Sequence, residues 1–127
     1  MVKIAFCQCT FWRDWEKTKK HIEIVSKFDT IDYIIIVVDQ TVPREEIEKV
    51  LREYRGKPQL IVKQVEFRDN LPEFRNHYVE ECKRLGVKWY IVSDPDEWIC
   101  EEVFKDIDCA SEVNVEVWLR VNKTWLN

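Results

Sequence analysis

Short apolar runs alternate with amphipathic stretches along the chain. Four short stretches rich in apolar residues predict strands at Val2 to Phe6, Tyr33 to Val38, Leu60 to Phe67 and Val87 to Val92. Apolar residues at helical spacing predict helices from Asp14 to Phe28, from Pro43 to just before Gly56, and from Asn70 to just before Gly86. A short helix near Ile99 to Ile107 and an alternating strand from Val113 to Val121 complete the pattern.

Local signals refine two of these helices. In the second helix, the apolar spacing predicts an inner face of Ile47, Val50, Leu51 and Tyr54. In the third, Asn70 and Glu73 form a capping-box pattern, and Gly86 is the residue expected to end the helix.

The order of elements, βαβαβαβαβ, predicts an α/β fold with a doubly wound, mostly parallel sheet. The run from Tyr33 to Val38 is apolar throughout, which is typical of a strand covered on both faces. Ligands of such sheets bind beyond the carboxyl ends of the strands, where the strand order reverses. The residues just after the strands are therefore the first candidates for a site.

Composition narrows the class of protein. The 127 residues predict a single domain, 1–127. With two glycines, the chain builds neither a GxGxxG turn nor a phosphate-binding P-loop. The net charge of −4, without a basic stripe, argues against nucleic acid as a partner. The apolar runs are too short for a transmembrane segment, and the charged start predicts no signal peptide, so we expect a cytoplasmic location.

The cysteines leave two interpretations open. Their number is odd and none form a CxxC pair: Cys7, Cys9, Cys82, Cys100 and Cys109. Zinc sites need ligand pairs at tight spacing, which this set and the two histidines do not supply. The pattern favours buried free thiols, and a disulfide is the alternative if the source is a thermophile.

Carboxylates gather after the fourth strand. Asp94, Asp96 and Glu97 fall within four residues, and Pro95 restricts the backbone there to extended geometry. Carboxylates at this spacing supply one side of a Mg²⁺ or Mn²⁺ shell, completed by phosphate and water oxygens. The competing interpretation is an acidic turn before a helix N-terminus. Asp39 follows the second strand, and two interpretations of it stay open: its carboxylate accepts hydrogen bonds from a nucleoside, or it caps its own loop.

These residues together resemble the family 2 glycosyltransferases. The matching pattern is a strand that ends in Asp39, the pair Arg75-Asn76 early in a helix, and a further strand that runs into Asp94-Pro95-Asp96-Glu97. The resemblance covers about residues 2–107 and implies the Rossmann-like GT-A fold, which binds nucleotide sugars. The expected partner is a nucleoside-diphosphate sugar, most often a UDP-sugar in that family.

The resemblance also implies residue roles. Asp39 would contact the nucleoside, and Arg75 the base or diphosphate. Asp94 would contact the ribose or the water shell of the metal, and Asp96 would ligate the Mn²⁺ or Mg²⁺ that bridges the diphosphate. Cys7 and Cys9 stand in the nucleotide-binding segment after strand one. The family has an aromatic residue at the position of Cys9, and Phe11 or Trp12 is the expected substitute.

The end of the chain departs from the family. Only 30 residues follow Glu97, where the family places its acceptor half and catalytic base. Glu112 and Glu116 are the late acidic residues, and neither is assigned as base. We therefore expect a short or truncated form that binds the donor, with Val113 to Asn127 of a second copy closing the site in a homodimer. The alternatives are a non-catalytic nucleotide-sugar-binding or interaction domain and, less favoured, a metal-dependent phosphohydrolase.

Overall fold

The computed structural model describes residues 2–99. It contains four strands, β1 (Ile4–Thr10), β2 (Tyr33–Asp39), β3 (Gln59–Val65) and β4 (Trp89–Val92). A single turn of 3₁₀ helix, η1 (Trp12–Asp14), leads into three α-helices, α1 (Trp15–Val25), α2 (Arg44–Glu53) and α3 (Leu71–Leu85). The strand from Val113 to Val121 and the helix near Ile99 to Ile107, apart from Ile99 itself, lie outside the described residues.

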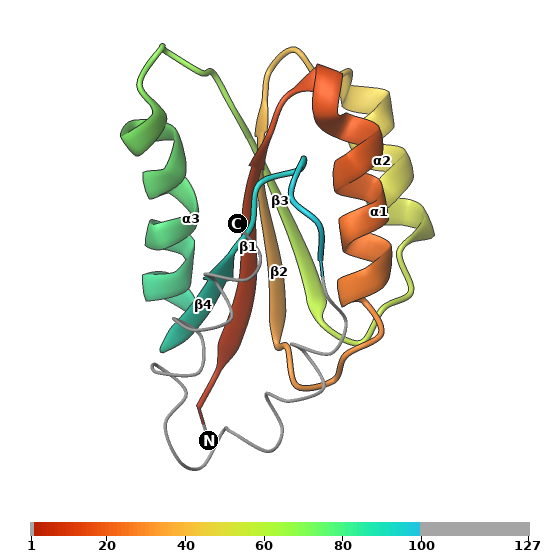
Figure 1. The fold of residues 1–127 in the computed structure, drawn as a ribbon, viewed down its shortest axis with the longest axis vertical. Helices are drawn as coiled ribbons and strands as arrows, with labels where there is room; N and C mark the ends of the chain where they lie inside the picture. Colours follow the sequence, from red (N-terminus) through yellow and green to blue (C-terminus); the bar gives the residue numbers. More distant parts are fainter. Residues whose placement is uncertain (1, 100–127) are drawn as a thin grey trace.

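The four strands form one sheet in the order β3-β2-β1-β4, and every pair is parallel. The chain moves outward from β1 through β2 to β3, and α3 then returns it so that β4 lies on the other side of β1 (Figure 1). The α/β class and the parallel sheet are confirmed, and the architecture is compatible with a Rossmann-like fold. The strand order reverses at β1.

Helices cover both faces of this sheet (Figure 1). Alternate residues of β1 point to opposite faces, so Ile4 and Phe6 pack with α1 and α2, whereas Ala5 and Cys7 pack with α3. The apolar run of β2 is buried because both of its faces are covered. Among residues 2–99, no helix combines the length and the apolar character needed to cross a membrane.

One predicted helix face is wrong in part. Ile47 is buried and Val50 and Tyr54 pack against the core, but Leu51 is 40% exposed. At 3.6 residues per turn, Val50 and Tyr54 lie to one side of Ile47 and Leu51 lies to the other. The core covers the side of α2 that carries Val50 and Tyr54, and leaves the side that carries Leu51 in contact with solvent.

The ends of α3 confirm the local signals. The Asn70 side chain accepts a hydrogen bond from the Glu73 backbone N–H at 3.0 Å. Gly86 ends the helix with a left-handed φ of 74°, which glycine adopts without the steric cost that a side chain brings. The cap fixes where α3 begins, and hence where Arg75 lies above the sheet.

Replacement of Asn70 with alanine is expected to lower the free energy of unfolding by about 1 kcal/mol, because it leaves the Glu73 N–H without its acceptor. Chemical denaturation measures the change. Asn76→Ala is the matched control, because the Asn76 side chain donates a hydrogen bond to the exposed Glu80 carboxylate at 3.1 Å, on the surface of the same helix. Equal losses in the two variants would contradict the capping role.

Candidate functional site

Two of the predicted site carboxylates lie at the same edge of the sheet. β2 ends at Asp39, and Asp94 follows the end of β4, parallel to it across β1. Val92 is opposite Cys7, so β4 stops three residues before β1 ends at Thr10. The chain after β4 therefore turns beside the last residues of β1, which confirms the shared edge that the element order predicts.

A pocket of about 320 Å³ opens at this edge. Its walls come from the end of β1, from η1, from the starts of α1 and α3, and from the turn after β4: Cys9, Phe11, Arg13, Asp14, Lys17, Leu71, Arg75, Asp94, Pro95 and Asp96. This is the point where the strand order reverses, the usual ligand position in open α/β sheets. The pocket brings Cys9, Arg75, Asp94 and Asp96 together, as predicted, but neither Cys7 nor Asp39 lines it.

The pocket carries charges of both signs. Arg75 lies 4.0 Å from the Asp94 carboxylate, measured between Nη2 and Oδ1, and both side chains are about half exposed. Arg13 pairs with Asp14 at 3.6 Å and lies over the Phe11 ring, 5.4 Å from its centroid. Such exposed pairs add little stability, because water screens them. Their cations are free to turn toward an anionic ligand.

The acidic turn after β4 is held by its own last residue. The Asp94 N–H donates to the Glu97 carboxylate at 2.9 Å, and the Glu97 N–H donates to the Asp94 carbonyl at 3.0 Å. Glu97 is therefore used to close the turn, which leaves Asp94 and Asp96 at the pocket. Within residues 2–99, no cluster of three or more His, Cys, Asp or Glu side chains is arranged to hold a metal ion. A cation here would take most of its ligands from phosphate and water.

An aromatic cluster lies beside the pocket and reaches it through Phe11. The rings of Phe11, Phe67 and Phe74 are mutual neighbours, with centroid distances of 5.1, 5.3 and 5.2 Å. Phe11 lines the pocket, whereas Trp12 is 47% exposed and does not. Of the two substitutes expected for the missing aromatic residue at Cys9, the structure places Phe11 in the pocket.

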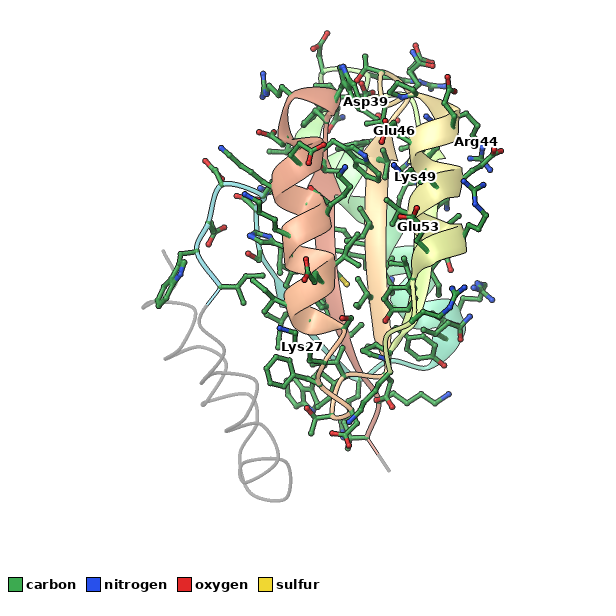
Figure 2. All side chains as sticks on the ribbon, turned by 90° about the vertical axis from the view of Figure 1, so that its right-hand side faces the viewer. Lys27, Asp39, Arg44, Glu46, Lys49 and Glu53 are labelled. Atoms are coloured by element: carbon green, nitrogen blue, oxygen red, sulfur yellow. The ribbon has the colours of Figure 1, made fainter. Side chains whose placement is uncertain are left out.

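Asp39 lies at the carboxyl ends of the strands (Figure 2), where its side chain holds two neighbouring segments in place. Its carboxylate is 6% exposed and accepts from the Thr41 N–H (3.2 Å), the Thr41 hydroxyl (2.6 Å) and the Phe67 N–H (2.9 Å). Burial by itself raises the pKa of Asp39, but these hydrogen bonds outweigh it and the pKa is lowered. By holding the Phe67 backbone, Asp39 supports the aromatic cluster that lies behind Phe11. Its direct contact with a nucleoside stays a prediction.

The two cysteines of β1 occupy different environments. Cys7 is fully buried and its Sγ lies 3.6 Å from that of Cys82. Cys9 lines the pocket, and burial raises its pKa to about 12, although the nearby Arg75 charge acts in the opposite direction. Cys9 is therefore a neutral thiol at neutral pH, suited to contact with a ligand rather than to nucleophilic attack.

Polar residues buried under α1 were missed from the sequence. The Gln8 side chain is hydrogen-bonded to His21 Nδ1 at 2.8 Å, and Thr18 donates to the Thr10 hydroxyl at 2.6 Å. The His21 ring also contacts the Glu97 carbonyl, so it ties α1 to the acidic turn. The predicted first strand ended at Phe6, because Gln8 and Thr10 are polar. β1 in fact continues to Thr10, because these two side chains are hydrogen-bonded to residues of α1. Their alternation with Cys7 and Cys9 was the available signal.

Stability is expected to fall as the pH drops below about 6.5, because burial lowers the pKa of His21 in the fold. The unfolded chain then binds more protons than the folded one, which favours unfolding. Urea denaturation between pH 7 and pH 5 measures the slope. His21→Gln removes this slope, and His77→Gln, which removes the other histidine, keeps it. A slope unchanged by His21→Gln would contradict the assignment.

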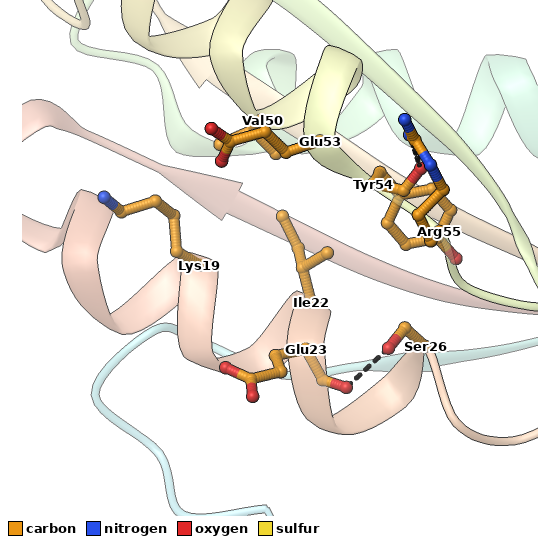
Figure 3. A pocket seen from close by; sticks show the side chains of 8 residues that line it. All are labelled: Lys19, Ile22, Glu23, Ser26, Val50, Glu53, Tyr54 and Arg55. Atoms are coloured by element: carbon orange, nitrogen blue, oxygen red, sulfur yellow. Dashed lines mark hydrogen bonds between the residues drawn. The ribbon is translucent and has the colours of Figure 1, made fainter.

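A second hollow, of about 370 Å³, lies between α1 and α2 on the outer side of the helix layer (Figure 3). Ile22 and Val50 face it, with charged side chains around them. None of the site residues predicted from the sequence lines this hollow, so the pocket at the carboxyl edge is the candidate site.

Comparison with known proteins adds no assignment: no family model and no curated protein matches the chain.

Proposed function

We propose that the pocket at the carboxyl edge binds a nucleoside-diphosphate sugar with a divalent cation, in a doubly wound domain of GT-A type that transfers the sugar to an acceptor. The observation that carries the proposal is the pocket's position and lining. It lies where the strand order reverses, and it combines the cations Arg13, Lys17 and Arg75 with the carboxylates Asp94 and Asp96. A metal-bridged diphosphate needs both kinds of group.

The cationic side chains would bind the diphosphate. Arg75 is the best placed, because its present partner, Asp94, is a half-exposed carboxylate 4.0 Å away that a phosphate can replace. Arg13, in η1, and Lys17, near the start of α1, approach the same pocket. Phe11 offers an aromatic face for the base, backed by Phe67 and Phe74.

The donor set also fits a hard divalent cation. Asp96 would ligate Mn²⁺ or Mg²⁺, and Asp94 would contact its water shell or the ribose. Glu97 is engaged in closing the turn, so Asp94 and Asp96 are the carboxylates that this turn offers to a cation. Two carboxylates fill only part of the coordination shell, which leaves positions for phosphate oxygens. The cation would offset negative charge on the leaving nucleoside diphosphate.

Calorimetry with UDP and GDP, each with and without Mn²⁺, tests this proposal. We expect Mn²⁺ alone to bind weakly, and UDP to bind more tightly with Mn²⁺ than without it. UDP should also bind more tightly than GDP. Equal nucleotide affinity with and without Mn²⁺ would contradict the metal bridge, and absence of nucleotide binding would overturn the proposal.

A second candidate is a domain that binds the donor without transferring its sugar. It is favoured by the ion pairs in the pocket: Asp14 and Asp94 each face an arginine, so neither is a free base. The late candidates Glu112 and Glu116, and the segment proposed to close a homodimer, lie outside the described residues. Transfer assays above and below the dissociation constant of any dimer separate the candidates. Donor binding with no turnover at either concentration supports the second.

A further inference from the structure

Two thiols meet in the core between β1 and α3. The Sγ atoms of Cys7 and Cys82 are 3.6 Å apart, although the residues are separated by 75 positions in the sequence. Cys7 is fully buried and Cys82 is 3% exposed. Both belong to the core cluster on the α3 side of the sheet, where Ala5, Ile35 and Tyr78 surround them with apolar contacts.

The contact shifts the pKa values of the two thiols in opposite directions. The hydrogen bond with Cys82 and burial raise the pKa of Cys7, whereas the hydrogen bond with Cys7 lowers the pKa of Cys82. Either sulfur can donate in this contact, and Cys82 is the one that more readily becomes a thiolate. A thiolate is the form that attacks a disulfide.

We propose that Cys7 and Cys82 are a site of reversible oxidation, at which a disulfide joins β1 to α3. With oxidised glutathione as the oxidant, the Cys82 thiolate attacks one of its sulfurs and releases a glutathione thiolate. The Cys7 thiolate then attacks the Cys82 sulfur and releases the second. Two protein thiols lose two electrons and two protons, and one glutathione disulfide becomes two glutathione thiols.

The geometry suits this step and keeps it slow. A disulfide places its sulfurs about 2.05 Å apart, so the two atoms must approach by about 1.5 Å. A glutathione molecule reaches Cys82 only when the core opens locally, because both thiols are buried. Once formed, the bond holds β1 beside α3. Cys9 and Arg75, on these same elements, line the pocket at the carboxyl edge.

Peptide mapping of the full chain after oxidation tests the proposal. The protein is incubated with oxidised glutathione just below its melting temperature, its remaining thiols are blocked, and it is digested with trypsin. We expect a cross-link between residues 4–13, which contain Cys7 and Cys9, and residues 76–83, which contain Cys82. The linked peptide is 2 Da lighter than the sum of its parts, and dithiothreitol separates it.

The variants identify the sulfur that bonds. Cys9→Ser should keep the cross-link and Cys7→Ser should abolish it. The oxidised protein should melt at a higher temperature than the reduced one, because the bond restricts the unfolded chain. If Cys7→Ser does not fold, fragmentation of the linked wild-type peptide makes the same distinction. A cross-link through Cys9, or no cross-link to Cys82 while other thiols are oxidised, would overturn the proposal.

Discussion

Replacement of Asp96 with alanine is expected to remove the Mn²⁺-dependent part of UDP binding, a loss of at least about tenfold in affinity with the metal present. The reason is that Asp94 and Asp96 are the carboxylates of the turn after β4 that line the pocket, because Glu97 closes the turn and Asp14, the other carboxylate in the lining, pairs with Arg13. The affinity for UDP without metal should change little. Calorimetry in the presence and absence of Mn²⁺ gives both values.

Two further variants make this result specific. Asp29→Ala removes the same charge from a largely exposed carboxylate paired with Lys57, away from the pocket lining, and should leave binding unchanged. Arg75→Ala should weaken UDP binding with and without Mn²⁺, because a guanidinium contacts phosphate directly. If Asp96→Ala lowers both affinities equally, Asp96 does not act through a metal.

Replacement of Asp39 with alanine is expected to lower the free energy of unfolding by about 3 kcal/mol at neutral pH. The change removes the acceptor of the Phe67 N–H and of both Thr41 donors, in a place that is almost closed to water. Chemical denaturation measures the loss. Thr41→Val, which removes only the hydroxyl donor, should cost about 1 kcal/mol.

The same carboxylate has a pH signature. The pKa of Asp39 is lower in the folded chain than the ordinary value of about 3.9, so the folded state binds fewer protons in acid. Its contribution is complete above about pH 4 and is lost as the pH falls through the folded pKa. The Asp39→Ala variant should lack this part of the acid transition. An unchanged transition would show that the hydrogen bonds do not set the pKa.

The Asp39 variant also separates two roles. If the carboxylate acts only by holding Phe67, its loss weakens UDP binding indirectly, through the aromatic cluster behind Phe11. In that case Phe67→Ala should lower the UDP affinity by the same amount as Asp39→Ala, with both variants measured in the folded state. If Asp39 contacts the nucleoside, as the resemblance to the glycosyltransferases implies, its loss weakens UDP binding more than Phe67→Ala does.

The sequence predicted the elements whose signals are local. The all-apolar run of β2 and the Asn70 and Gly86 ends of α3 depend on neighbouring residues, and the structure confirms them. The end of β1 was missed, because Gln8 and Thr10 are buried only through partners on α1. Leu51 was misplaced because the width of the covered stripe depends on the sheet.

The site was predictable where topology alone decides it. Parallel strands place Asp39 and Asp94 at one edge whatever their side chains do. The hydrogen bond from the Phe67 N–H to Asp39 was not predictable, because it forms only when β2 pairs with β3. The pairing of β1 with β4 likewise brings Arg13 and Lys17 to the acidic turn, about 80 positions later in the chain.

The most direct test of the nucleotide site is the broadening of backbone amide NMR signals by a small amount of Mn²⁺ with UDP present. If a metal is held at Asp96, signals should be lost from the non-proline residues of 94–97, 71–75 and 9–13, which surround the pocket. Signals from residues 27–32 and 56–59, at the opposite edge of the sheet, should persist. Broadening centred away from the 94–97 turn, or the same broadening without UDP, would contradict a metal-bridged nucleotide in this pocket.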